Sequence, residues 1–247
     1  MSLTEPVTAP GAPGADEPVV ELLGVRAAYG AIEVLKGVDL TVPAGSVVAL
    51  LGPNGGGKTT TMKIVSGLMP STSGELRISG RNVTGITATE ASRLGICSIP
   101  EGRGVFANLT VRENLWVATG TGRKRSEIED AAYVRFPKLA ERRNQLAGSM
   151  SGGEQQMLSL SRALGTDPVV LLLDELSMGL APMIVSQMYD IVGQLAAEGI
   201  SILVAEQFAR VVLPIADTAA LMLGGRVVRV GRPAEIEDEL STTYLGG

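Results

Sequence analysis

Apolar residues along this chain fall in short runs separated by glycine, proline and charged residues. Such runs, when bounded by turn residues, are typical of strands in a sheet that is buried on both faces. The pattern predicts strands at residues 19–26, 35–42, 47–51, 75–79, 95–99, 169–173, 201–205, 218–223 and 227–231. Helices are expected at 60–68, 88–94 and 182–198, a connection at 27–33 and a turn at 71–74. Because strands and helices alternate, the fold class is expected to be α/β, with a mostly parallel sheet covered by helices.

The middle third of the chain follows a different period. Between residues 110 and 164 apolar positions recur nearly every four residues, which favours helices. One helix is expected around Leu109, Val111, Leu115 and Trp116, and another around 157–164. We therefore expect a helical subdomain at about 105–164. Residues 1–17 are rich in Pro, Gly, Ala and Thr without periodicity, so a disordered tail is expected there, with the folded domain at 18–247.

A glycine-rich segment, Gly52-Pro53-Asn54-Gly55-Gly56-Gly57-Lys58-Thr59, matches the P-loop pattern G-x-x-x-x-G-K-[ST] between an expected strand and an expected helix. Glycines let the backbone N–H groups wrap an oligophosphate closely. Lys58 supplies a positive charge for the β- and γ-phosphates, and Thr59 offers a hydroxyl to Mg²⁺. The helix N-terminus also favours an anion. The alternative is a glycine-rich turn, but the strand and helix around the segment favour a nucleotide site.

Two carboxylates, Asp174 and Glu175, end the apolar run at 169–173. Asp174 would lie where Mg²⁺ can be reached, and Glu175 where a water could be polarised for attack on the γ-phosphate. An acidic pair after a strand is weak evidence by itself, because a solvated strand end explains it equally well. In a chain with a P-loop, a catalytic pair is the better interpretation.

A second possible anion site opens the expected helix near residue 157. The segment Ser151-Gly152-Gly153-Glu154-Gln155 begins with a good N-cap, and its glycines leave backbone N–H groups accessible. A helix cap with a flexible lead-in is the alternative explanation, and for this segment in isolation it would be preferred.

Composition narrows the function further. The 247 residues are 45% hydrophobic, enough for one large domain or two small ones, and the net charge of −5 offers no surface for nucleic acid. Cys97 is expected to be a buried, inert thiol. No apolar run approaches the roughly 20 residues that span a bilayer, and no signal sequence is evident, so the chain is expected to be neither secreted nor inserted. It contains no histidine.

Together these motifs resemble the ATP-binding-cassette (ABC) family of transporter ATPases over residues 18–247. The resemblance implies a RecA-like core with an antiparallel β subdomain and a helical subdomain, ATP and Mg²⁺ as cofactors, and a head-to-tail dimer. Residues 151–155, hereafter the signature segment, would cap the ATP held by the partner's P-loop, and Tyr29 would stack on adenine. The implied nucleotide-binding residues are Tyr29, Gly52, Asn54, Gly55, Gly56, Gly57, Lys58, Thr59, Thr60, Ser151, Gly152, Gly153 and Glu154.

Several positions differ from the usual family pattern. Glu101 stands in place of a Mg²⁺-sensing glutamine, Gln207 in place of the switch histidine, Glu154 in place of the signature glutamine, and Ala181 in place of an aspartate. The implied metal residues are therefore Thr59, Glu101 and Asp174, and the implied catalytic residues are Glu175 and Gln207.

These differences, with segments 100–103, 150–157, 179–182, 206–207 and 244–247, resemble one ATP-binding subunit of bacterial branched-chain amino-acid importers. Expected partners are a second ATPase subunit, integral-membrane permeases contacting Glu101, Arg103 and 110–119, and indirectly a solute-binding protein. The chain would then lie at the cytoplasmic face of the membrane. Open alternatives are an importer ATPase for another small polar solute, a soluble ABC ATPase acting on nucleic acid or the ribosome, and a phosphotransferase, which would leave the signature segment unexplained.

Overall fold

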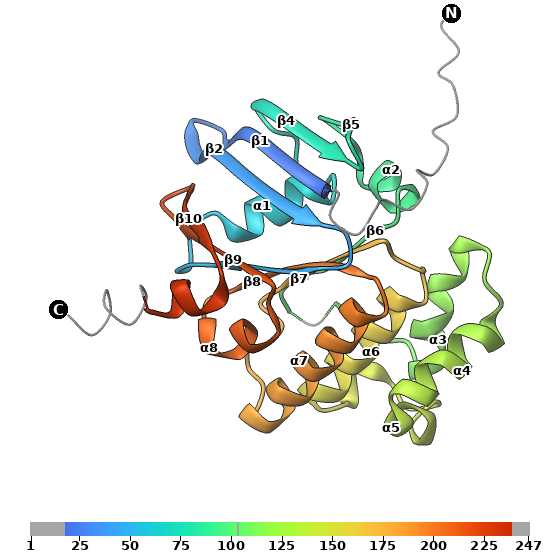
Figure 1. Cartoon of the computed structure of the whole chain (residues 1–247). Coiled ribbons are helices and arrows are strands. Elements are labelled where there is room, and N and C mark those ends of the chain that lie inside the picture. Colours follow the sequence, from blue (N-terminus) through green and yellow to red (C-terminus); the bar gives the residue numbers. More distant parts are fainter. Residues whose placement is uncertain (1–17, 103, 239–247) are drawn as a thin grey trace, which may run out of the picture.

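A computed structural model of the chain describes residues 18–102 and 104–238, and its strands form two sheets (Figure 1). The tail expected at 1–17, Arg103 and the segment 244–247 lie outside the described residues. One sheet is antiparallel in the order β2-β1-β4-β5, with bounds β1 Pro18–Tyr29, β2 Ile32–Pro43, β4 Ser73–Ile78 and β5 Arg81–Asn82.

The second sheet has the order β10-β9-β3-β8-β7-β6 and is parallel except for β10. Its strands are β3 Val47–Leu51, β6 Ile96–Ile99, β7 Val170–Asp174, β8 Ser201–Glu206, β9 Thr218–Leu223 and β10 Arg226–Gly231. All residues of β3, β7 and β8 are buried, because both faces of the sheet are covered. This confirms the α/β class with a mostly parallel sheet.

Alternate residues of β3 enter two different hydrophobic cores, as the two-residue period of a strand requires. Val48 and Leu50 pack with α1 (Lys58–Val65) and the antiparallel sheet. Val47, Ala49 and Leu51 belong to the other core, beneath α6 (Gly152–Leu164) and α7 (Pro182–Ala197). In Figure 1, α1 lies between the sheets, and α6, α7 and α8 (Ala209–Val212) cover the opposite face of the parallel sheet.

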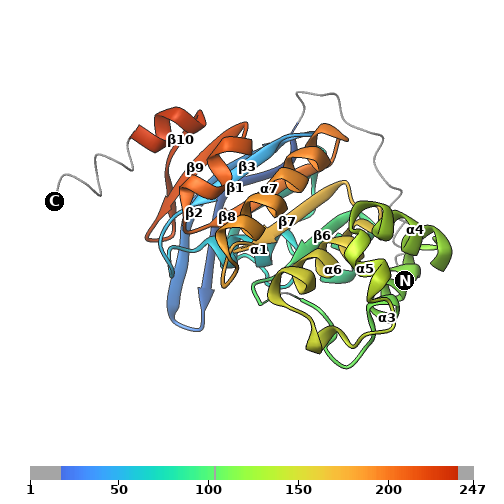
Figure 2. The ribbon, with the colours of Figure 1, turned by 90° about the horizontal axis from the view of Figure 1, so that it is seen from below.

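A group of helices lies to one side of the parallel sheet in both Figure 1 and Figure 2, beyond β6. Helix α6 contacts all three of its members and also β6, so it joins this group to the core. The group comprises α3 Val111–Trp116, α4 Arg125–Arg135 and α5 Pro137–Glu141. The remaining elements are α2 Ala88–Arg93 and the 3-10 turns Val117–Thr121, Ala147–Ser149 and Leu213–Ile215. No described helix has both the length and the apolar character needed to cross a membrane.

Some boundaries differ from the sequence prediction. The connection expected at 27–33 is a tight hairpin in which Tyr29 pairs with Ile32, and both strands continue into solvent. The sequence of this hairpin, Ala-Ala-Tyr-Gly-Ala-Ile-Glu, has no alternation of apolar and polar residues that would predict two strands. The turn expected at 71–74 is wrong at its end, since β4 begins at Ser73. Cys97 is half-buried rather than fully buried, and its partial burial still raises the pKa of its thiol.

Candidate functional site

The candidate site lies where three neighbouring parallel strands, β3, β7 and β8, end. Leu51 is in register with Glu206, and Asp174 with Ala205, so the loops that follow these strands leave the sheet side by side. Ligands of open α/β sheets bind beyond the carboxyl ends of the strands, where adjacent loops diverge. The P-loop and the acidic pair, more than a hundred residues apart in sequence, are therefore brought together.

Glycine is required at position 57, which caps the N-terminus of α1. Gly57 has a φ of 111°, and an added Cβ would approach Leu35 Cδ2 to 2.8 Å and Met222 Cε to 2.7 Å. Any other residue would be strained in this left-handed backbone conformation and would displace the Leu35 and Met222 side chains. The helix N-terminus thereby faces a cavity of about 320 Å³, lined by Val34, Asn54, Gly55, Gly57, Lys58, Thr59, Thr60, Glu101 and Glu175.

Lys58 is buried at this cavity and held by fixed acceptors. Its Nζ donates to the Gly52 carbonyl at 2.9 Å and to the Pro53 carbonyl at 3.2 Å, and it forms an ion pair with Glu175 Oε1 at 3.3 Å. A buried ammonium needs such partners because desolvation penalises the charge. Lys58 therefore has a fixed position before any anion arrives.

Glu175 lies in a strained backbone conformation. Its φ of 50° is uncommon for a residue with a side chain, and its backbone N–H donates to the Ala205 carbonyl at 2.9 Å. Strained residues of this kind concentrate at functional sites, where surrounding contacts hold them. This backbone conformation turns the chain sharply after β7. The Glu175 carboxylate thereby lies against Lys58.

Asp174 has the features expected of a cation ligand. It is buried, and its Oδ1 has no hydrogen-bond partner among the described residues. Burial raises the pKa of Asp174, as do the charges of Glu175 and Glu101, whereas a hydrogen bond with Thr59 and the charge of Lys58 lower it. A cation would remove this unfavourable burial of negative charge. The described residues contain no cluster of three His, Cys, Asp or Glu that could hold a metal alone.

A buried network next to this site was missed by the sequence analysis. Glu206, at the end of β8, accepts hydrogen bonds from the Ser177 N–H at 3.0 Å, from the Ser177 hydroxyl at 2.9 Å and from the Tyr189 hydroxyl. It ties the turn after Glu175 to β8 and α7. The available signal was a carboxylate ending a buried strand, as Asp174 does, but the position of Tyr189 has no sequence signature.

Substitution of Tyr189 by phenylalanine is expected to lower both stability and turnover. The variant leaves the buried Glu206 with fewer donors, so the free energy of unfolding should fall by about 1.5–3 kcal/mol, the usual range for a hydrogen bond to a charged group. Denaturant titration and steady-state ATP hydrolysis measure the two effects. Tyr133→Phe is the matched control, because Tyr133 donates to Glu129 at 3.1 Å outside the site. Equal behaviour of the two variants would contradict a positioning role.

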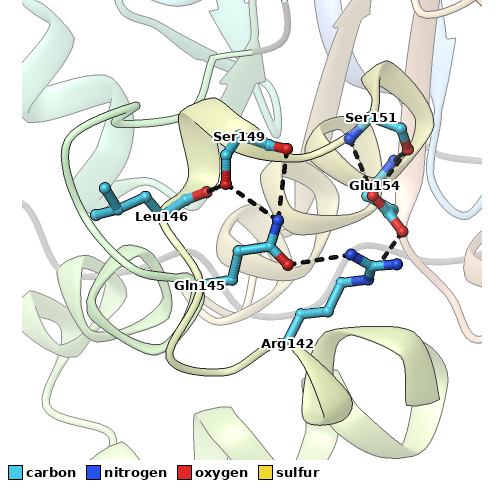
Figure 3. Close-up of polar contacts among 6 residues, drawn as sticks. All are labelled: Arg142, Gln145, Leu146, Ser149, Ser151 and Glu154. Atoms are coloured by element: carbon cyan, nitrogen blue, oxygen red, sulfur yellow. Dashed lines mark hydrogen bonds and ion pairs between the residues drawn. The ribbon is translucent and has the colours of Figure 1, made fainter.

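The signature segment opens α6 with a complete capping box (Figure 3). The Ser151 hydroxyl accepts from the Glu154 N–H at 3.4 Å, and Glu154 Oε2 accepts from the Ser151 N–H at 2.9 Å. Gly153 is buried, and an added Cβ would approach Ile184 Cγ2 of α7 to 2.7 Å. Close packing of α6 on α7 is therefore one sufficient reason for glycine at 153.

Not every predicted residue lines the cavity. Gly52 and Gly56 belong to the P-loop but do not line the cavity. Residues 151–154 lie at the N-terminus of α6 and do not line it. Tyr29 is half-exposed at the end of β1, with Lys63 Nζ 3.4 Å from its hydroxyl and 5.7 Å from its ring centre. Gln207 is exposed directly after β8 and is also absent from the lining.

A buried lysine on a P-loop, with an acidic pair at the end of the nearby parallel strand β7, is the arrangement typical of nucleotide-binding P-loop proteins. Residues 35–177 match the ABC transporter family. The chain therefore belongs to this family, as an ATP-binding cassette whose members are ATPases that power transport.

Individual relatives make the comparison more specific. The high-affinity branched-chain amino acid transport ATP-binding protein BraG of Pseudomonas aeruginosa is 41% identical over 225 residues, covering 89% of this chain and 96% of BraG. The probable branched-chain amino acid transport ATP-binding protein LivF of Archaeoglobus fulgidus is 37% identical, covering 86% and 91%. A crystal structure of the ADP conformation of an ABC transporter cassette has a TM-score of 0.80 and 26% identity, covering 91% and 95%.

Proposed function

We propose that this chain is the ATP-hydrolysing subunit of an importer for branched-chain amino acids. The observation that carries the ATPase function is the contact of P-loop Lys58 with Glu175 beside the buried Asp174. The similarity to BraG and LivF, both named for branched-chain amino acid transport, supports the choice of solute.

In this proposal, each group at the cavity has one task. Lys58 and the amides of the P-loop bind the β- and γ-phosphates, and Tyr29 stacks on the adenine. Thr59, Asp174 and Glu101 hold Mg²⁺ together with phosphate oxygens, since Mg²⁺ in such sites uses one or two carboxylates plus substrate phosphates. Mg²⁺ would supply positive charge that neutralises the phosphates. Glu175 orients water and accepts its proton.

The proposed assembly contains two ATPase subunits, identical or different, that enclose ATP between one P-loop and the partner's residues 151–154. Because the signature segment does not line its own chain's cavity, it is available to a partner. Motion of the dimer would pass to separate permeases at the cytoplasmic face of the membrane, and a solute-binding protein would deliver the solute. No contact with nucleic acid is part of this function.

Gln207→Ala is expected to slow hydrolysis more than it weakens ATP binding. In the proposal the Gln207 amide contacts the γ-phosphate and the attacking water in the closed dimer, and loss of one such donor costs roughly 10²-fold in turnover. Calorimetry and steady-state kinetics separate the two quantities. Because the chain has no histidine, the pH profile should be the same for both proteins. Kinetics identical to wild type would assign Gln207 to packing.

Deletion of the gene tests the solute. In a strain with no second importer, uptake of leucine, isoleucine and valine should fall, and a plasmid copy should restore it. The Glu175→Gln plasmid should not restore it, which connects uptake to ATP hydrolysis. Normal uptake of all three amino acids would contradict the solute assignment and leave the ATPase function standing.

An unrelated solute is the alternative outcome of this experiment, because the lipopolysaccharide export system ATP-binding protein LptB of Escherichia coli K12 is also 30% identical to this chain.

A further inference from the structure

Glu154 combines a helix-capping contact with an ion pair (Figure 3). Its Oε2 accepts hydrogen bonds from the Ser151 N–H and the Ser151 hydroxyl, both at 2.9 Å. Its Oε1 forms an ion pair with Arg142 Nε at 3.0 Å. The side chain of Glu154 is only 13% exposed, whereas that of Arg142 is 42% exposed. One carboxylate therefore sets the orientation of the Ser151 hydroxyl and is itself held by Arg142.

The charge of Glu154 is unfavourable at this position if the N-terminus of α6 receives a phosphate. Burial raises the pKa of Glu154, but the hydrogen bonds from Ser151 and the charges of Arg142 and Lys138 outweigh it, and the pKa lies below its ordinary value. Glu154 is therefore ionised at neutral pH. A carboxylate and a phosphate within a few ångströms repel each other, most strongly where water is excluded. Arg142 is the cation in direct contact with this carboxylate.

Arg142 also connects the signature segment to the chain that leads into it. Its Nη1 donates to Gln145 Oε1 at 3.0 Å. Gln145 Nε2 in turn donates to the Ser149 hydroxyl at 3.0 Å, and that hydroxyl donates to the Leu146 carbonyl at 2.8 Å. These contacts run from the end of α5 to the first turn of α6. Arg142 therefore binds both the Glu154 carboxylate and Gln145, which lies in the stretch that leads into the signature segment.

We propose that Arg142 is a positioning residue for the signature segment, which compensates the charge of Glu154 and holds its carboxylate on Ser151 while an ATP phosphate from a partner chain binds there. The proposal rests on the function proposed above, in which the signature segment meets the partner's ATP. Its specific consequence is that the need for Arg142 depends on Glu154. A neutral glutamine at 154 brings no charge and should make Arg142 dispensable.

A double-mutant cycle tests this dependence, with ATP hydrolysis by the purified chain as the readout. Arg142→Ala should reduce kcat by about tenfold, within the range of coupling between contacting residues. ATP binding to the P-loop should be unchanged in calorimetry. Added to Glu154→Gln, the Arg142→Ala change should have little further effect. Arg142→Lys should keep most activity because it keeps the charge. Higher salt should partly restore Arg142→Ala by screening.

Arg143→Ala is the matched control, because it removes the same charge from the next, exposed residue, which forms no ion pair with Glu154 among the described residues. It should behave as wild type. A wild-type kcat in Arg142→Ala would overturn the proposal. The proposal would also be overturned if Arg142→Ala lowered kcat by the same factor in the Glu154→Gln background as in the wild-type background, because Arg142 would then have a packing role. Thermal unfolding of all variants detects misfolding. Failure of the proposed function itself looks different, since the wild-type chain would then show no ATP hydrolysis either alone or with its partner ATPase subunit.

Discussion

Glu175→Gln is expected to reduce ATP hydrolysis by roughly 10²- to 10⁴-fold, the usual loss on removal of a general base. Glutamine keeps the size of the side chain but cannot accept the proton of the attacking water. Lys58 keeps its two carbonyl acceptors at 2.9 and 3.2 Å, so the loop should not collapse. Loss of the Glu175 charge also removes a repulsion that raises the pKa of Asp174. ATP binding should therefore be retained or strengthened.

Two measurements check this prediction together. Turnover is measured by phosphate release, and assembly by size-exclusion chromatography with ATP and Mg²⁺, where the variant should accumulate as a dimer. Glu198→Gln is the control, because Glu198 forms a half-exposed ion pair with Arg135 away from the cavity. Near-normal turnover with only monomer present would show that another group is the base. Two measurements are needed because a chain that pairs only with a different subunit would not dimerise alone.

The features that could be predicted from the sequence are those formed by residues that are contiguous in the chain. The P-loop and the pair Asp174 and Glu175 are contiguous motifs, and their residue types alone indicate phosphate and Mg²⁺ chemistry. Strands β3, β7 and β8 are apolar runs because both faces of the sheet are buried. These features made the α/β class and the place of the cavity predictable.

The parts that the sequence did not predict are contacts between distant segments. The partners Lys58 and Glu175 are 117 positions apart, and Glu206 meets Tyr189 only because α7 covers β8. Helical or strand periodicity reports which side of an element is buried, not which side chain lies opposite. The short helices α4 and α5 lie within the helical subdomain expected at about 105–164, but their bounds were not predicted, because each has few large apolar residues.

Some of the predicted site residues come together within a single chain, and others do not. Lys58, Thr59, Glu101 and Glu175 line one cavity, with Asp174 buried beside it. Gln207, Tyr29 and residues 151–154 do not line it, so their roles stay predictions. Those roles depend on a nucleotide and a partner chain.

Lys58→Ala is expected to weaken ATP binding by about 10- to 100-fold, because the loss of a hydrogen bond to a charged group costs about 1.5–3 kcal/mol. The structure adds a second cause. Without Lys58, Glu175 loses its ion-pair partner at 3.3 Å and stands beside Asp174 with its charge uncompensated, where it repels the phosphates. The same substitution in a Glu175→Gln background removes this repulsion.

The double variant should therefore bind ATP more tightly than Lys58→Ala alone, yet less tightly than Glu175→Gln alone. Calorimetric titration with ATP at fixed Mg²⁺ gives the three affinities. Thermal unfolding without nucleotide shows whether each variant is folded. Lys124→Ala, which removes an exposed lysine from the start of α4, controls for the loss of one positive charge and should bind as wild type. If Lys58→Ala also bound ATP as wild type does, the P-loop assignment would be wrong. If the double variant bound no better than Lys58→Ala, the charge of Glu175 would not act on the phosphates.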